Sequence, residues 1–340
     1  MRTAVDSQKR AHRAVGPTSK AWRATRLVIV ATVVIGSLAS CQPAWPPTKN
    51  GVFAGCCAQA KVNAFGTWLG RTPDLVVDFL PGGNWEQVEH PVAWVAPWTG
   101  SPWQMSFSVP MLVPGATLAI GATGAYNSHF ATLAQELVDR GLGDAILRLG
   151  WEFNGFWYPW RAKPDRDAFK QYWRKIVKAM RSVSGANFKF DWNPIIGKYE
   201  FPAVEAYPGD AFVDYIGMDI YDKSDVHYPI PAGATAQEAQ NRRQAVWNEH
   251  LNGNEGLTYW ALFAQDHGKR ISLPEWGLMT PSYVGGGDNV YFIEQLHNWI
   301  LWHDVAYHAY FNSTGGLGDH RLTGATTFPA AAARYQELFG

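Results

Sequence analysis

The spacing of apolar positions changes repeatedly along most of the chain, between a pattern typical of strands and one typical of helices. From about residue 60 onward, short runs of β-forming residues are separated by longer segments with apolar residues at helical spacing. The predicted strands are residues 63–69, 75–80, 104–109, 145–151, 188–192, 215–221, 270–275 and 305–311. The predicted helices are residues 127–141, 165–183, 236–250, 258–267 and 290–302. Such alternation is typical of a parallel α/β fold.

Eight strands with intervening helices predict a single (β/α)8 TIM barrel over residues 60–340. The first units are less regular, because residues 81–124 are rich in Pro and Gly and a helix there is hard to place. These long loops are expected to build the walls of a cleft. In such a barrel the catalytic residues lie at the carboxyl ends of the strands.

The first 40 residues have the pattern of a targeting segment. A basic stretch precedes an apolar run, residues 27–39, which is short for a bilayer span but has the proportions of a signal peptide. Cys41 follows at once, as in a bacterial lipobox, and predicts acylation of Cys41 and an enzyme tethered on the outer face of the membrane. An ordinary cleaved signal or an uncleaved anchor are the alternatives. Residues 41–59, with several prolines, are predicted to be a tether.

Composition narrows the function classes. The 340 residues are 47% hydrophobic and 17% charged, which permits a substantial core and argues against disorder. Basic and acidic residues number 29 each, but residues 1–40 hold seven basic residues and one acid, which leaves 22 basic and 28 acidic residues. A net charge of about −6 gives no support for nucleic-acid binding. The chain is expected to be a monomer without a cofactor.

Aromatic, histidine and cysteine residues add further indications. The 17 Trp residues indicate either a Trp-rich core or a groove lined with flat aromatic surfaces that suit sugar rings. The ten His residues show no zinc-ligand spacing, so no metal site is predicted. Cys56 and Cys57 are adjacent, and adjacent cysteines rarely bridge, so they form either a strained vicinal pair or free thiols.

Two short motifs suggest the chemistry. Each places one Glu at the end of an apolar strand, Glu152 after residues 145–149 and Glu275 after residues 270–273. An unpaired carboxylate is costly in a core. Glycoside cleavage needs two carboxylates, one to protonate the leaving oxygen and one to attack the sugar carbon. In the predicted barrel both would point over the same mouth, from strands 4 and 7.

Three segments carry a resemblance to a known family. Arg148 with Glu152-Phe-Asn-Gly-Phe-Trp-Tyr-Pro-Trp160, residues 213–222, and Pro274-Glu275-Trp276-Gly277 resemble glycoside hydrolase family 26. That family comprises retaining β-glycanases, mostly β-mannanases, with (β/α)8 barrels. The resemblance covers about residues 60–335.

The resemblance implies roles for individual residues. Glu152 would be the general acid/base and Glu275 the nucleophile, with Tyr221 donating a hydrogen bond to it. The further substrate-binding candidates lie at predicted strand ends or beside the motifs: Arg148, Asn154, Trp157, Trp160, Trp192, Trp276 and, at the end of the first predicted strand, Trp68. Asp219 would either pair with Arg148 inside the barrel or contact a sugar.

Departures from the family pattern leave the substrate open. Trp151 stands where mannanases place His before the acid/base, and Tyr310, Phe311 and Asn312 occupy a region that often ends in Trp. We expect an endo-acting retaining hydrolase of β-linked polysaccharide, with mannan, xylan, β-glucan and cell-envelope glycans as candidates. The alternatives are a glycan-binding lipoprotein on a catalytically inactive barrel and an envelope scaffold protein.

Overall fold

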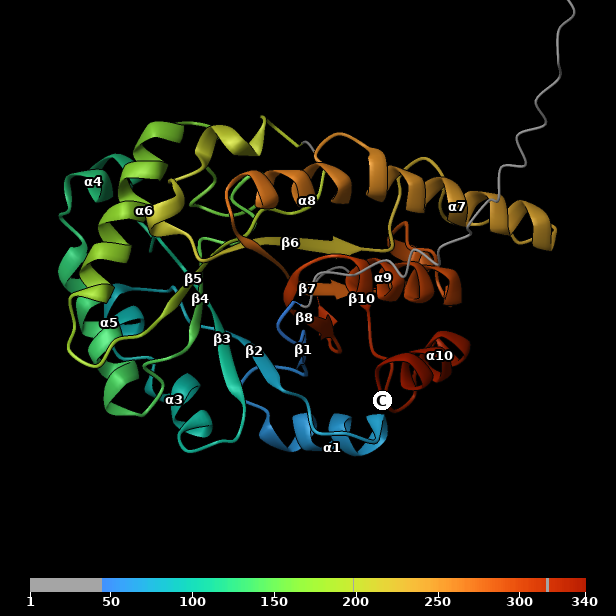
Figure 1. The fold of residues 1–340 in the computed structure, drawn as a ribbon, viewed down its shortest axis with the longest axis horizontal. Coiled ribbons are helices and arrows are strands. Elements are labelled where there is room, and N and C mark those ends of the chain that lie inside the picture. The colour runs from blue at the N-terminus through green and yellow to red at the C-terminus, as the bar shows by residue number, and fades with distance from the viewer. Residues whose placement is uncertain (1–44, 198, 316–317) are drawn as a thin grey trace, which may run out of the picture. The chain divides into compact units, whose positions relative to one another are not determined.

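Eight parallel strands close into a barrel in chain order (Figure 1). The structure is a computed structural model, and it describes residues 45–197, 199–315 and 318–340. The strands are β1 (Lys49–Phe53), β2 (Leu75–Phe79), β3 (Gln104–Val109), β4 (Ile146–Leu149), β5 (Lys189–Trp192), β6 (Tyr215–Tyr221), β7 (Arg270–Gly277) and β8 (Val305–Phe311). Parallel pairing of β1 with β8 completes the closure, so the predicted TIM barrel is confirmed.

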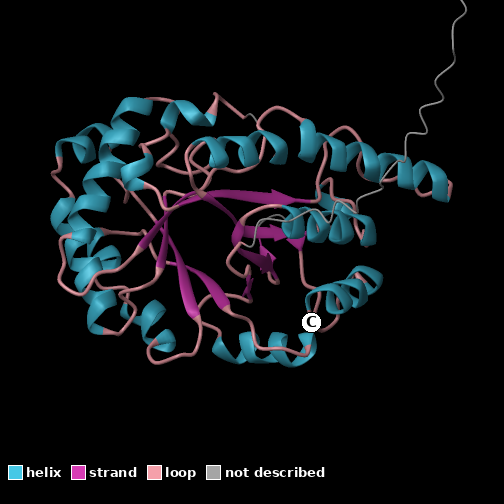
Figure 2. Ribbon diagram, viewed as in Figure 1, coloured by secondary structure: helices cyan, strands magenta, loops and turns pink. Residues whose placement is uncertain are grey.

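Helices surround the strands (Figure 2). They are α1 (Gln59–Leu69), α2 (Trp85–Glu89), α3 (Val92–Val95), α4 (Leu118–Thr123), α5 (Asn127–Asp139), α6 (Arg166–Arg181), α7 (Ala236–Asn252), α8 (Leu257–Asp266), α9 (Val290–Trp302) and α10 (Pro329–Phe339). A short hairpin of β9 (Thr314–Gly315) and β10 (Gly318–Asp319) follows β8.

Local sequence explains the helix starts. The carboxylate of Asp165 accepts a hydrogen bond from the N–H of Ala168 at 2.8 Å and caps α6. At α7, Thr235 and Glu238 form a reciprocal capping box. The predicted helix over residues 290–302 matches α9 at both ends, and the other four predicted helices differ from the structure by a few residues at most.

The first predicted strand is wrong. Residues 63–69 lie inside α1, whose buried residues Val62, Phe65, Gly66 and Leu69 follow helical spacing. The true first strand is Lys49–Phe53, within the segment predicted to be a tether. Its five residues pair with β8 over their whole length, so residues 49–59 are part of the barrel. Residues 41–44 lie outside the described residues.

The irregular region after β2 and β3 contains short helices instead of long loops alone. The pair α2 and α3 follows β2, and α4 and α5 follow β3. The side-chain carbonyl of Asn84 caps α2, and the hydroxyl of Thr117 caps α4. Helices of four to six residues hold too few apolar positions for a periodic pattern. The last helix, α10, was not predicted.

The barrel interior is polar at its centre. Arg148 on β4 contacts Asp219 on β6, and Asp191 on β5 accepts hydrogen bonds from Ser272 on β7 and Tyr307 on β8. These strands are not neighbours in the sheet, so the contacts cross the inside of the barrel. All five side chains are buried. The apolar core lies mainly between the strands and the helices.

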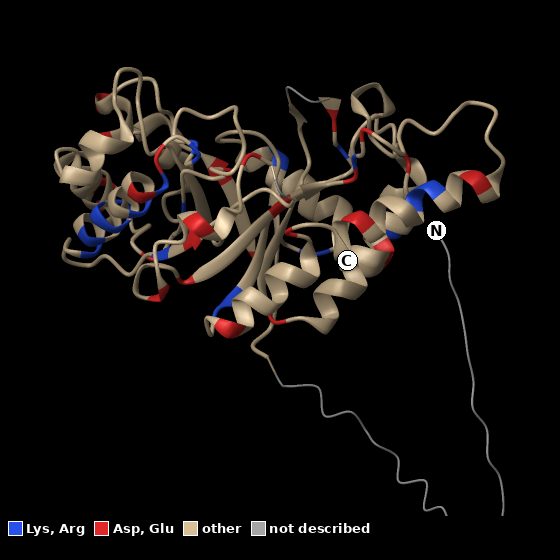
Figure 3. Ribbon diagram, turned by 90° about the horizontal axis from the view of Figure 1, so that it is seen from above, with Lys and Arg blue, Asp and Glu red and all other residues tan. Residues whose placement is uncertain are grey.

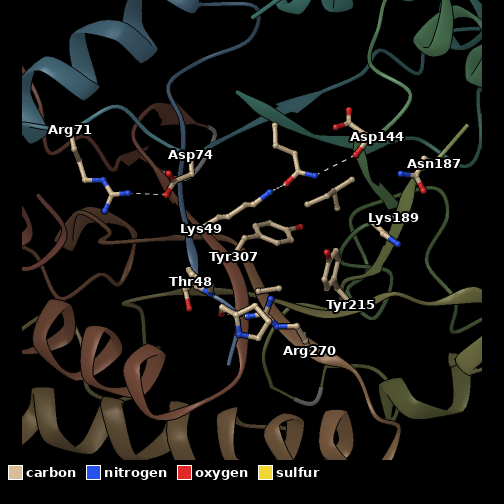
Figure 4. A pocket seen from close by; sticks show the side chains of 15 residues that line it. Thr48, Lys49, Arg71, Asp74, Asp144, Asn187, Lys189, Tyr215, Arg270 and Tyr307 are labelled. Atoms are coloured by element: carbon tan, nitrogen blue, oxygen red, sulfur yellow. Dashed lines mark hydrogen bonds and ion pairs between the residues drawn. The ribbon is translucent and has the colours of Figure 1, made fainter. Parts of the chain in front are cut away.

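A cavity of about 780 Å³ lies at the amino-terminal end of the barrel. Its lining includes Lys49, Lys189, Tyr215 and Arg270, which are the first residues of their strands (Figure 4). Charged and polar side chains pair with one another there, as Lys49 does with Gln104. This cavity is therefore at the end opposite to the one where barrels of this class carry catalytic residues.

Charged residues of both signs are distributed over the outer helices (Figure 3). Helix α7, for example, carries Glu238 and Glu249 together with Arg242 and Arg243. Within the described ranges, no helix combines the length and the hydropathy needed to cross a bilayer. The predicted signal segment and Cys41 lie outside these ranges.

Candidate active site

Glu152 is presented by an unusual turn at the end of β4. Both Gly150 and Glu152 have a φ of +52°, which is the left-handed region that side chains other than Gly rarely adopt. A Cβ on Gly150 would lie 2.5 Å from Sδ of Met111, so only Gly fits there. The N–H of Glu152 donates to the carbonyl of Asn193 at 2.7 Å and holds the turn against the end of β5. Such backbone strain often marks functional sites.

Glu275 lies in β7 just after an irregularity in the strand register, directly opposite Asp219 of β6. The hydroxyl of Tyr221 donates to its Oε1 at 2.5 Å, as the resemblance predicted. Its Oε2 lies 3.5 Å from Nη2 of Arg148 and accepts no hydrogen bond from the described residues. One oxygen of Glu275 is thus anchored, and the other faces a positive charge.

The two carboxylates lie at the same end of the barrel, and Asp219 lies beside them. Oxygen atoms of Glu152, Asp219 and Glu275 are all within 4.8 Å of one another. Glu152 is 8% exposed and Glu275 is 9% exposed, so only a small part of each side chain is accessible. In retaining glycosidases the two carboxyl groups are about 5–5.5 Å apart, whereas inverting enzymes need about 6.5–9.5 Å. The separation fits the retaining class.

Arg148 places one positive charge beside this cluster. Its Nη2 contacts both oxygens of Asp219 at 3.0 and 2.7 Å, which confirms the predicted pairing inside the barrel. Its Nη1 donates to Ser108 at 2.9 Å and its Nε to the side-chain oxygen of Asn193 at 2.6 Å. The guanidinium is fully buried, so it supports carboxylates and does not reach a sugar hydroxyl.

Burial and neighbouring charge set the protonation of Glu152 and of Tyr221. Burial, together with the negative charge of Glu275, raises the pKa of Glu152 well above that of an ordinary Glu. Glu152 is therefore protonated at neutral pH, as a general acid must be. Burial and the adjacent Glu275 also raise the pKa of Tyr221, which keeps its hydroxyl protonated as a hydrogen-bond donor.

Trp157 is the predicted aromatic residue that the structure places in the site. Its indole N–H donates to Oε2 of Glu152 at 2.7 Å, and the side chain is 38% exposed. The ring packs edge-on against Tyr199, at 5.3 Å between centroids. An exposed indole beside the acid provides a flat surface for a sugar ring and a contact to the reacting carboxyl group.

Two other predicted substrate-binding residues point away from the barrel interior. Side chains alternate along a strand, so Trp192 and Trp276, which follow the inward Asp191 and Glu275, point outward to the helices. Both are fully buried. Trp192 packs against Trp260 of α8, and Trp276 against residues of α10. Their assignment as sugar contacts is wrong, because a solute cannot reach them.

Three further assignments need correction, two because the side chain is buried and one because of its position on a helix. Trp160 is 4% exposed and its indole N–H donates to the carbonyl of Trp151, so it supports the turn from behind. Asn154 is fully buried, and its amide exchanges hydrogen bonds with the backbone of Ile195. Trp68 belongs to α1 and stacks on Tyr335 of α10. All three stabilise the fold.

Trp151, which replaces the family's His, forms part of an aromatic cluster. Its indole N–H donates to the hydroxyl of Tyr158 at 2.9 Å, and its ring packs on Phe79 at 5.4 Å and on Trp160 at 4.6 Å. Phe79 in turn lies under the guanidinium of Arg148 at 5.7 Å. Trp151 is only 6% exposed, so its indole is engaged by protein groups.

Some residues that surround Arg148 carry no recognisable motif in the sequence. Ser108 and Asp191 belong to the interior layer around Arg148, and no motif identifies them. A weak signal exists, since Ser106 and Ser108 alternate with apolar residues on β3. Polar residues at alternate positions of an otherwise buried strand indicate a polar barrel interior.

Comparison with known proteins identifies the same family as the motifs. The model of glycosyl hydrolase family 26 matches residues 115–234, which include Glu152 but not Glu275. A mannan endo-1,4-beta-mannosidase of Bifidobacterium adolescentis is 28% identical over 227 residues. This match covers 58% of the chain and 22% of that protein, so the chain spans about a fifth of the relative's length.

Solved structures share the fold. A modular endo-β-1,4-mannanase from Cellulomonas fimi superposes with a TM-score of 0.57 at 17% identity, over 86% of this chain and 70% of that one. The catalytic domain of a family 26 endo-β-1,4-mannanase from Bacillus sp. JAMB-750 gives a TM-score of 0.56 at 16% identity, over 86% and 85%. At these identities the likeness concerns the barrel alone. The match of residues 115–234 and the motifs make this chain similar to glycosyl hydrolase family 26.

Proposed function

We propose that the chain is a retaining glycoside hydrolase that cleaves β-linked polysaccharide, with Glu275 as nucleophile and Glu152 as general acid/base. The observation that carries the proposal is the pair of carboxylates within 4.8 Å of each other, one of which, Glu152, has a pKa raised by burial and by its neighbour. The family match supports the same reaction class.

In the first step, Oε2 of Glu275 attacks the anomeric carbon and Glu152 gives its proton to the departing glycosidic oxygen. The Tyr221 hydroxyl, on Oε1, orients the nucleophile for this attack. Arg148, 3.5 Å from Oε2, favours the ionised carboxylate before bond formation. A glycosyl ester of Glu275 and a shortened chain result.

In the second step, Glu152 acts as the base. It takes a proton from water, which attacks the same anomeric carbon and releases Glu275. The charge of Glu275 is absent in the ester, so the pKa of Glu152 falls and the group becomes a carboxylate that can accept the proton. Trp157, which donates to Glu152, stabilises that ionised form.

β-Mannan is the first substrate to test, because the relatives named above are mannanases. Trp151 in place of His alters a position next to the acid/base, and for this reason xylan, mixed-linkage β-glucan and envelope glycans belong in the same screen. New reducing ends are counted for the native chain and for Glu275→Gln. Glu337→Gln, an exposed acid on α10, is the matched control and should remain fully active.

Product stereochemistry tests the mechanism directly. Proton NMR during hydrolysis should show the β-anomer first, with mutarotation afterwards, because two inversions restore the configuration. Initial formation of the α-anomer would rule out a glycosyl-enzyme on Glu275. Saturable glycan binding that survives Glu275→Gln, with no new reducing ends on any glycan, would instead favour a binding protein.

For localisation, we propose export and lipid attachment at Cys41. The support is the basic stretch, the apolar run of residues 27–39 and the Cys that follows it. Expression in a bacterium should give a membrane-associated mature chain whose acylated first residue is Cys41. Cys41→Ser should release the chain from the membrane fraction or leave the precursor unprocessed. A soluble native chain cleaved at another position would show an ordinary signal peptide instead.

A further inference from the structure

Cys56 and Cys57 are adjacent residues in the turn between β1 and α1. This turn lies at the carboxyl end of the barrel, the same end as Glu152 and Glu275. Their Sγ atoms are 2.8 Å apart, and Cys56 is exposed while Cys57 is partly exposed. Two thiols in contact at an accessible turn can be oxidised together.

The backbone has the conformation that brings the two sulfurs together. Adjacent Cα atoms are about 3.8 Å apart, which is closer than the usual 4.4–6.8 Å of bridged cysteines, so neighbouring cysteines meet only in special turns. Cys57 has a φ of +58° and follows Gly55 with a φ of +106°. These left-handed residues reverse the chain and place both side chains on one side.

A buried carboxylate holds this turn in place. Oδ2 of Asp78, at 0% exposure, accepts the N–H of Cys57 at 2.9 Å and the indole N–H of Trp98 at 2.9 Å. Its Oδ1 accepts the N–H of Phe79 at 2.8 Å. Asp78 therefore fixes the turn whatever the state of the sulfurs. Since both oxygens are engaged, the carboxylate is a poor third ligand for a metal, and the group favours thiol chemistry.

We propose that Cys56 and Cys57 are a modification site, a dithiol that closes into a vicinal disulfide in the presence of a small disulfide oxidant. The thiolate of Cys56, the more exposed residue, attacks one sulfur of oxidised glutathione and releases one glutathione thiolate. The thiolate of Cys57 then attacks Sγ of Cys56 and releases the second. The protein loses two electrons and two protons, and two molecules of reduced glutathione form.

Closure is reversible by thiol reductants, because an exposed bridge between adjacent residues belongs to the labile class of disulfides. Burial raises the pKa of both thiols, and that of Cys56 more strongly than that of Cys57, so closure is expected to accelerate as the pH rises and the thiolate fraction grows. The site does not depend on the hydrolase activity, since neither sulfur contacts a catalytic carboxylate among the contacts of the described residues.

Peptide mass spectrometry on the full chain tests this assignment. The chain is incubated with oxidised glutathione, alkylated with iodoacetamide and digested with trypsin, which cuts after Lys49 and Lys61. The peptide of residues 50–61 contains both cysteines, and Cys41 falls in another peptide. We expect this peptide to lose two hydrogens, to resist alkylation, and to regain both after treatment with dithiothreitol.

Other products would overturn the proposal. These are a stable glutathione adduct on either residue, a cross-link from Cys41 to this peptide, or complete alkylation of both thiols after oxidant treatment. Cys57→Ser is the matched control, because it keeps Cys56 exposed but removes the resolving thiol; its peptide should retain glutathione. The native chain should also close faster than the chain unfolded in urea, which lacks the turn. Equal rates would mean that the fold contributes nothing.

Discussion

The ends of β4 and β7 each present one Glu to the same opening, but they do so differently. Glu152 follows its strand in a left-handed turn and accepts a hydrogen bond from an exposed indole. Glu275 lies inside its strand, between a buried tyrosine hydroxyl and a buried guanidinium. Both carboxyl groups are nearly buried, but the partner of Glu152 is a partly exposed side chain, whereas the partners of Glu275 are buried.

This difference matches the two roles in double displacement. A nucleophile needs a fixed position, which the contacts of Glu275 with Tyr221 and Arg148 provide. An acid/base must exchange a proton twice, and its pKa must respond to the charge of its neighbour. Identical residues thus acquire different chemistry from the backbone and the donors around them.

Removal of the nucleophile should have the largest effect. Glu275→Ala should lower kcat by about 10⁴-fold or more on every substrate, because no other oxygen is placed to form the ester. Reducing-end assays on polysaccharide and release of an aryl leaving group both measure this. External azide should restore turnover with an inverted product, and failure of that rescue in a folded variant would argue against Glu275 as nucleophile.

Removal of the acid should have a smaller effect that depends on the substrate. Glu152→Ala should lower kcat on polysaccharide by about 10²–10⁴-fold. The first step with an aryl glycoside of low leaving-group pKa should be nearly unaffected, because that oxygen needs little protonation. Burst kinetics separate the two steps. Equal losses on both substrates would contradict the assignment of Glu152 and remove the distinction between the two ends.

Tyr221→Phe tests the fixed partner of the nucleophile. A hydrogen bond to a charged group contributes about 1.5–3 kcal/mol, so a loss of about 10–100-fold in kcat is expected. KM for polysaccharide should change little, because the hydroxyl contacts Glu275 and the substrate chain lies elsewhere. A change confined to KM would instead make Tyr221 a sugar contact.

The pH profile tests the raised pKa of Glu152. Burial and Glu275 raise this pKa, so the protonated acid persists to higher pH than for an ordinary Glu. Activity on polysaccharide should therefore fall only as the pH rises through that raised value. The basic limb should be absent from the first step of Glu152→Gln on an aryl glycoside. A limb that remains there would belong to another group.

Trp157→Phe should have the smallest effect. The substitution keeps an aromatic surface but removes the N–H that donates to Glu152 and favours its ionised form. The pKa of Glu152 should rise further, which moves the basic limb of the pH profile upward, while kcat at the optimum changes only a few-fold. A downward shift would mean that the indole does not stabilise the carboxylate.

Much of the barrel was predictable because strands and helices have distinct periods. Seven strands, five helices and both catalytic candidates follow from local patterns and motif resemblance. The first strand was misplaced because residues 63–69 are mostly apolar. Their helical spacing becomes visible only when Val62, which precedes them, is included with Phe65. Lys49–Phe53 is a short strand that directly follows several prolines. Its partner strand, β8, lies over 250 residues later in the chain.

The sequence by itself determined the two carboxylates, the partner Tyr221, and the alternation that closes the barrel. Tertiary structure decided which aromatic residues are accessible beside Glu152: Trp157 is, whereas Trp192 and Trp276 point outward into the helical layer. It also decided that Arg148 faces Asp219 and Glu275, and that Cys56 contacts Cys57. The physical reason is that residue type sets the available chemistry, but strand register, side-chain alternation and backbone turns set direction and access.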